Sequence, residues 1–207
     1  STFTETAAAT AAIRAGGSLS ITSLSGGVQL AGDHAAGAGL FIDANNDITI
    51  VDGGLASAMG MGLSSSYGDL VLTGSNRGTI VKSGGMMSVA VANLRVYGGN
   101  AINPGTPGSN TSVAFYGSGA QEDISGHGAG VAIKSAMAQD IQVGSGEIWL
   151  QAGSASNGGG YGGYLYGGSV GIWSGNSQVI QAGSIKLFGG SSGHDNVAEI
   201  QSFGDQA

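Results

Sequence analysis

The sequence predicts an all-β fold, a parallel β-solenoid in which short strands stack along one axis and loop insertions leave the coil. Three observations predict it: apolar residues alternate with polar ones in runs of three to five, the runs repeat with fixed internal spacing, and glycines flank them. Alternation with a period of two is typical of strands with one buried face. Runs this short cannot form amphipathic helices, so we expect almost no helix.

The composition separates the chain from a disordered linker. It has 207 residues and 42 glycines, but 41% of its residues are hydrophobic and its mean hydropathy is +0.17. Gly-rich disordered segments are poor in apolar residues and cannot build a core. We therefore expect one β-solenoid domain over residues 1–207, as an excerpt or a subunit of a longer repeat array.

The charge balance excludes several classes of partner. The chain carries six Lys and Arg residues against 13 Asp and Glu, for a net charge of −7, and it has no Cys. Nucleic acids require clustered cations, and a membrane helix requires about 20 mostly apolar residues. The absence of Cys removes disulfides and zinc–thiolate sites. We expect no nucleic acid, no membrane insertion and no cofactor.

Two short templates repeat along the chain. The first reads small apolar, any, Ile or Phe, any, Ser or Gly, three of any, Gln, and the second reads G-x-[IL]-x-[IL]. The first occurs at Val113 to Gln121, Val131 to Gln139, Val170 to Gln178 and Ala198 to Gln206. The second occurs at Gly17 to Ile21, Gly68 to Leu72, Gly146 to Leu150 and Gly183 to Leu187.

The spacing of the templates predicts the coil length. We take seven apolar residues as equivalent anchors, most of whose separations lie near one or two times about 18–19 residues, while the separations of 28 and 29 require loops or irregular turns. Three stretches that break this period are expected to be loops. The anchors are Ile13, Ile42, Ile80, Phe115, Ile133, Ile172 and Ile200, and the loops are Gly53 to Gly68, Gly98 to Ser112 and Gly153 to Gly163.

The last position of the first template is always Gln. Stacked amides can hydrogen-bond along the axis of a solenoid, so we expect a structural Gln ladder. The main competing architecture, an antiparallel β-sandwich, requires no such repeat. The predicted ladder comprises Gln121, Gln139, Gln178 and Gln206.

At the repeat V-x-I-x-S-x-x-x-Q followed by G-x-I-x-L-x-G-G, as in Val170 to Gln178 and Gly183 to Gly190, the chain resembles the filamentous-haemagglutinin-like large exoproteins. These are bacterial proteins exported by two-partner secretion, with repeats of this length folded as right-handed parallel β-helices. The resemblance implies a secreted or cell-surface stalk, adhesin or fibre that is not an enzyme. It covers the part of the chain after Val113 best.

No motif for catalysis or metal binding stands out. Ser169 fits G-x-S-x-G without the strand-to-helix context of a nucleophile elbow, and the Asp and Asn residues of Ala44 to Thr49 are explained by a turn. His34, His127 and His194 lie in Gly-rich segments interpreted as solvated turns. A polysaccharide-degrading β-helix remains an alternative, and it would require two of the scattered acids to meet in one groove.

Aromatic residues are the candidate binding residues. Exposed Tyr and Trp offer a large contact area at low entropic cost, which suits a glycan or a cell-surface protein. The two Trp residues occupy positions expected to face outward. This alternative, a glycan-binding module, would use Trp149, Tyr161, Tyr164, Tyr166 and Trp173.

The last repeat predicts self-association. It stops at Gln206, whereas the two preceding copies continue to Ile141 and Ile180, so we expect the next coil to come from further chain or from another copy. Identical ends that stack head to tail make a contact that does not close, which builds a fibre. The preferred hypothesis is therefore a stalk or repeat region of a bacterial surface adhesin, or a subunit of an extracellular filament.

Overall fold

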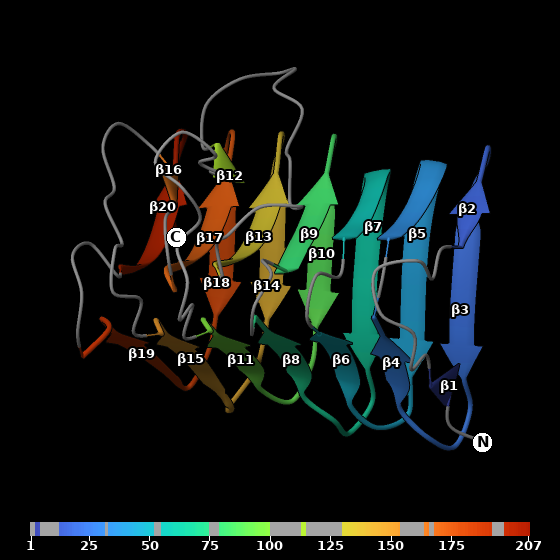
Figure 1. The fold of residues 1–207 in the computed structure, drawn as a ribbon, viewed down its shortest axis with the longest axis horizontal. Helices are drawn as coiled ribbons and strands as arrows, with labels where there is room; N and C mark the ends of the chain where they lie inside the picture. Colours follow the sequence, from blue (N-terminus) through green and yellow to red (C-terminus); the bar gives the residue numbers. More distant parts are fainter. Residues whose placement is uncertain are drawn as a thin grey trace, which may run out of the picture.

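The computed structural model describes ten segments of the chain, and every regular element in them is a strand. Figure 1 shows the strands of two large sheets following one another from the N-terminal to the C-terminal end of the fold. The described residues are 3–4, 13–31, 33–51, 55–74, 79–99, 113–114, 130–153, 164–165, 168–191 and 197–207.

The first large sheet has seven strands, which lie in chain order and pair in parallel. Apolar and polar residues alternate in them, so one face of the sheet is buried. The strands are β1 (Phe3–Thr4), β4 (Val28–Leu30), β6 (Ile48–Val51), β8 (Leu70–Thr73), β11 (Leu94–Tyr97), β15 (Glu147–Gln151) and β19 (Ser184–Phe188).

The second large sheet has 11 strands and is also parallel. A third, antiparallel sheet pairs β12 (Val113–Ala114) with β16 (Tyr164–Leu165). The strands of the second sheet are β2 (Arg14–Ala15), β3 (Leu19–Ser23), β5 (Asp33–Ala44), β7 (Leu55–Ser65), β9 (Thr79–Ser83), β10 (Met87–Ala90), β13 (Val131–Ser135), β14 (Gln139–Gln142), β17 (Val170–Ser174), β18 (Gln178–Gln181) and β20 (Ala198–Ser202).

The second sheet forks at β7. The first part of this strand pairs with β9 and its last part pairs with β10. Beyond the fork one row runs through β9, β13, β17 and β20, and the other runs through β10, β14 and β18. The chain passes between the rows at Gly84 and Gly85, where it lies so close to Met59 that a Cβ on Gly85 would stand 2.3 Å from the Met59 carbonyl oxygen.

The prediction of a right-handed parallel β-helix is wrong. The described strands form two separate parallel sheets of seven and 11 strands, the larger of which forks, rather than a repetition of one coil. Partners in neighbouring strands lie 21 residues apart at Ser64 and Asp43, but 54 apart at Glu147 and Asn93. No uniform coil of about 18–19 residues can produce such separations. The antiparallel sandwich is also wrong for these strands, since only β12 and β16 pair in that direction.

The predicted equivalence of all seven anchors is wrong, because some of them belong to different rows of the second sheet. Ile42 pairs in register with Leu63 at the end of β7, whereas Ile80 pairs with Leu55 at its beginning. The later copies of the template do correspond, since Ile133 pairs with Ile172 and Ile172 pairs with Ile200.

One predicted loop is a strand. Gly53 to Gly68 contains the 11 residues of β7, because its glycines alternate with apolar residues that face the core. The predicted loops Gly98 to Ser112 and Gly153 to Gly163 fall mostly outside the described residues. In the described part of the chain, no helix has the length and apolarity to cross a membrane.

The core lies between the sheets and consists of aliphatic side chains stacked in register. Along the first sheet, the equivalent positions of Ile48, Leu70, Leu94 and Ile148 are all fully buried. Each such side chain packs on the one above and below it as well as across the core. Burial of a Leu or Ile side chain contributes about 1.5–3 kcal/mol, so the stacks supply much of the stability.

Candidate functional site

Three of the four predicted ladder glutamines lie in one row inside the fold. Gln206 donates from Nε2 to Gln178 Oε1 at 2.7 Å, and Gln178 donates from Nε2 to Gln139 Oε1 at 2.6 Å. Gln139 in turn donates to the sulfur of Met87 at 3.4 Å. Gln121 lies outside the described residues.

The glutamine row is a structural element rather than a site for chemistry. Gln178 is fully buried, and each of its two amide atoms has a partner. A buried amide without partners would cost about 1–3 kcal/mol, so the row allows polar side chains to line up inside an apolar interior. All three amides point the same way along the row.

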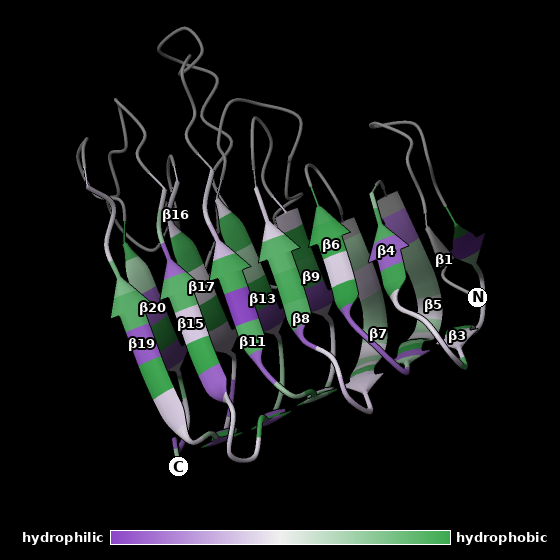
Figure 2. Ribbon diagram, turned by 90° about the horizontal axis from the view of Figure 1, so that it is seen from below, coloured by the Kyte–Doolittle hydropathy of each residue, from purple (hydrophilic) through white to green (hydrophobic). Residues whose placement is uncertain are grey.

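Trp149 lies on the outer face of the first sheet, between the inward-facing Ile148 and Leu150. Its register partners are Arg95 on β11 and Lys186 on β19. The Trp149 ring lies 4.5 Å from the ring of Phe188, and Lys186 Nζ lies 5.3 Å from the Trp149 ring centre. Figure 2 shows β11, β15 and β19 side by side, each with hydrophilic bands among hydrophobic ones. We call Trp149, Phe188 and Lys186 the aromatic platform.

A chain of ion pairs runs beside the aromatic platform. Arg95 Nε binds Asp69 Oδ2 at 2.9 Å, and Arg95 Nη1 lies 3.6 Å from Glu147 Oε1. Glu147 also pairs with Lys186. The hydrogen bond from Lys186 holds the pKa of Glu147 below its usual value, and the hydrogen bond to Asp69 raises the pKa of Arg95. These charges fix the side chains that border the platform.

The expectation that Trp173 faces solvent is wrong. Its side chain is 2% exposed and lies over Gly171, where an added Cβ would stand 2.3 Å from ring atom Cζ2. The indole Nε1 donates to Glu199 Oε1 at 3.0 Å. Desolvation by burial raises the pKa of Glu199, although the bond from Trp173 opposes the shift. A buried indole cannot form a contact surface for a ligand.

The side chains of the three predicted tyrosines lie outside what the structure describes, so their part in the binding surface stays a prediction. Tyr164 lies in β16, with its backbone paired to Ala114, and nothing is described of its side chain. Tyr161 and Tyr166 lie outside the described residues.

The residues considered for catalysis are structural where they are described. His34 is buried in β5 rather than in a solvated turn, and its Nδ1 accepts a bond from the Ile13 amide. Ser169 is buried and its hydroxyl accepts a bond from the Val197 amide. Within the described segments, no three acidic or His side chains gather into a possible metal site.

Sequence reasoning missed Phe188, Lys186 and Arg95. The signal was present in the second template, since GEIWL and GSIKL place Trp149 and Lys186 at the same outward position. If the two segments are aligned as neighbouring strands, Lys186 lies beside Trp149 and Phe188 lies beside Gln151. The observed pairing of β15 with β19 has this register. Arg95 could not be found in this way, because its strand lacks the template's glycine.

The chain matches no protein family model, no curated protein and no solved structure. The arrangement of its residues is therefore the main evidence on function.

Glu199 and Glu147 predict opposite effects of pH. The raised pKa of Glu199 gives a stabilising contribution that is complete below the unfolded pKa and is lost as pH rises through the folded value. Replacement Glu199→Gln should therefore become more favourable, relative to wild type, from about pH 4 to about pH 7. Glu199→Leu, which removes the acceptor for Trp173, should cost about 1 kcal/mol.

Glu147→Gln is the matched control. The free energy of unfolding of both variants is measured by urea denaturation near pH 4 and near pH 7. The lowered pKa of Glu147 gives a contribution that is present above the unfolded pKa and is lost as pH falls. Glu147→Gln should therefore be more harmful near pH 7 than near pH 4. The same pH trend for both variants would contradict the assignment.

Proposed function

We propose that the protein is a structural element of a bacterial extracellular filament or surface stalk, and that copies join head to tail at the end of the fold formed by β19, β20 and residues 205–207, which pair with β18. The observation that carries the proposal is an abrupt change in burial at that end. Ile148 and Leu150 on β15 are fully buried, whereas their register partners Ile185 and Leu187 on β19 are 49% and 45% exposed.

Ile185 and Leu187 occupy inward positions of the sheet. On every earlier strand from β4 to β15, the residues at these two positions are fully or almost fully buried. The apolar stack thus ends on half-exposed side chains. Covering them with one further layer would recover the burial free energy that the preceding layers already have.

The outermost strands at this end each have one partner strand in the part of the chain that the structure describes. Among the described strands, β19 pairs only with β15, and β20 pairs only with β17. An edge strand presents a row of unpaired N–H and C=O groups, which is a template for another strand. Since every pair in these sheets is parallel, the added strands should run in the same direction.

The opposite end of the fold supplies strands of that kind. There β3 pairs only with β5 among the described strands, and Leu19 and Ile13 are only partly buried. Arg14 is exposed at this end and Asp205 is exposed at the other. A head-to-tail contact between the two ends uses two different surfaces and extends without closing, which builds a filament.

The extracellular placement rests on other support. It comes from the resemblance of the repeats to filamentous-haemagglutinin-like exoproteins and is consistent with a chain that has no Cys. The assembly proposal stands on the burial pattern and the edge strands and can be tested separately.

Self-association should appear as concentration-dependent growth in sedimentation velocity and as filaments in negative-stain electron microscopy. The double variant Ile185→Lys and Leu187→Lys should be monomeric, because it places two charges in the contact. Tyr67→Lys is the control, since Tyr67 is 79% exposed and lies between β7 and β8, away from both ends. A wild-type chain that stays monomeric up to its solubility limit would refute the proposal.

The aromatic platform supports a second function, glycan binding. The Trp149 and Phe188 rings lie side by side on an outer face, Lys186 Nζ lies over the Trp149 ring, and Glu147 pairs with Lys186. Both charged groups can hydrogen-bond hydroxyl groups. Flat aromatic faces flanked by fixed polar groups suit the apolar face of a sugar ring.

This second function is tested on a glycan array. Trp149→Ala should lower the affinity for any bound glycan on the order of tenfold, as expected for a central aromatic contact. Tyr67→Ala is the matched control, because Tyr67 is an aromatic residue that is 79% exposed outside the platform. Equal losses for both variants, or no bound glycan at all, would exclude the platform.

A further inference from the structure

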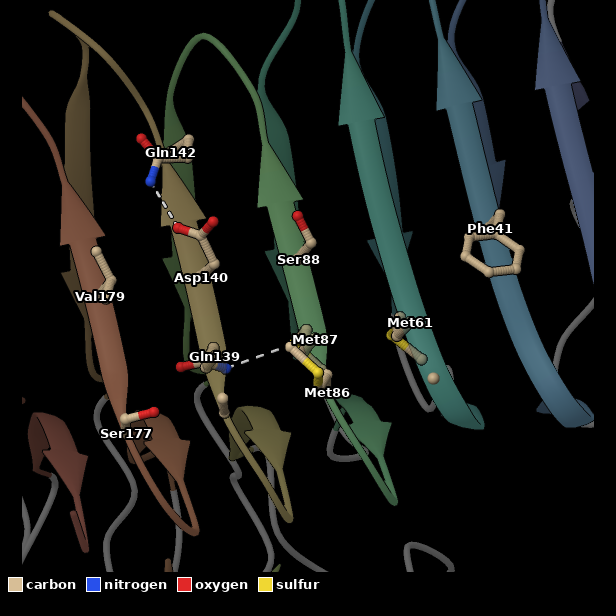
Figure 3. Close-up of a pocket in the computed structure, with 12 residues that line it drawn as sticks. Phe41, Met61, Met86, Met87, Ser88, Gln139, Asp140, Gln142, Ser177 and Val179 are labelled. Atoms are coloured by element: carbon tan, nitrogen blue, oxygen red, sulfur yellow. Dashed lines mark hydrogen bonds between the residues drawn. The ribbon is translucent and has the colours of Figure 1, made fainter. Parts of the chain in front are cut away.

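A groove crosses the outer face of the second sheet, on the row that includes β10, β14 and β18. Its volume is about 460 Å³, and it lies on the opposite face of these strands from the core (Figure 3). Pockets for small ligands usually have a volume of about 300–1,000 Å³. This groove is separate from the open end and from the aromatic platform.

The shape of the groove follows from side-chain size along a register row. Phe41 on β5 and Val179 on β18 stand at its two ends, and between them Gly62, Ser88 and Asp140 occupy the equivalent positions. Gly62 has no side chain and Ser88 has a small one, so the surface of the sheet is hollowed between the larger side chains of Phe41 and Val179. The groove therefore runs along the stacking direction for roughly 19 Å, or four strand spacings.

The walls of the groove are apolar and exposed. Phe41, Met86 and Val179 are all exposed large apolar residues that line it. A Cβ on Gly62 would lie 3.1 Å from Phe41 Cδ1, so this glycine makes room for the ring against the sheet. Methionine side chains are flexible and polarisable and adapt to ligands of different shape. Such a gathering of exposed apolar residues marks an interaction site.

One carboxylate gives the groove its charge. Asp140 Oδ1 accepts a hydrogen bond from Gln142 Nε2 at 2.6 Å, and no cationic side chain among the described residues pairs with Asp140. The groove thus combines apolar walls with one negative charge that is paired with no cation of the described segments. The whole chain has a net charge of −7, so an anionic ligand is disfavoured further.

We propose that this groove binds a small amphipathic organic cation, whose ammonium group pairs with Asp140 and whose apolar body lies between Phe41 and Val179. The carboxylate selects the charge, and Phe41 and Met86 supply contacts for an aromatic or alkyl body.

Three probes that share one apolar body test the proposal by isothermal titration calorimetry: 4-phenylbutylamine, 4-phenylbutanol and 4-phenylbutyrate. The amine should bind most tightly and the carboxylate most weakly. Asp140→Asn should weaken binding of the amine about five-fold at low salt and leave the alcohol unchanged. Asp205→Asn, at an exposed acid outside the groove, should have no effect.

A second variant tests the place of the apolar body. Ser88→Leu fills the middle of the groove at an exposed position, so it should fold and weaken binding of both the amine and the alcohol. The unfolding transition of each variant is compared with wild type. Equal affinity for the three probes, binding insensitive to Asp140→Asn and Ser88→Leu, or no saturable binding would each overturn the proposal.

Discussion

Parallel pairing in register is the constraint on which the rest of the structure depends. Each strand places its residues directly beside the equivalent residues of the strands before and after it, whatever length of chain lies between them. Core stacks, the glutamine row and the ion pairs at Arg95 are consequences of this register. The register also places irregularities together. Small residues at successive positions of one row form a groove, and a core stack that ends leaves apolar side chains exposed at the end of the fold. The proposed assembly and ligand sites are such places.

Strand positions and the direction of side chains could be predicted from the sequence. Alternation with a period of two separates Ile148 and Leu150, which are buried, from Trp149, which lies on the outer face. Copies of one template also correspond in space, as Ile172 and Ile200 do. These features are local or depend on direct similarity between segments, so one sequence contains the information they require.

Architecture and burial outside the core could not be predicted. The fork at β7 depends on the pairing of one long strand with two shorter ones, and its glycines are equally typical of a loop. Unequal insertions concealed the register, so an apparent repeat of about 18–19 residues led to the wrong fold class. Trp173 occupies an outward position but is buried, because its ring lies over Gly171 and binds Glu199. The groove beside Asp140 likewise appears only when residues from five strands are placed together.

Distances between spin labels test the register most directly, and the absence of native cysteines makes labelling simple. Ala90, Gln142 and Gln181 occupy one outer row on β10, β14 and β18, although 52 residues separate the first two strands. Continuous-wave EPR on the double cysteine variants should give backbone separations of about 5 Å for Ala90 and Gln142 and about 10 Å for Ala90 and Gln181. Spectra without dipolar broadening for either pair would contradict the stacking of these strands and every site derived from it.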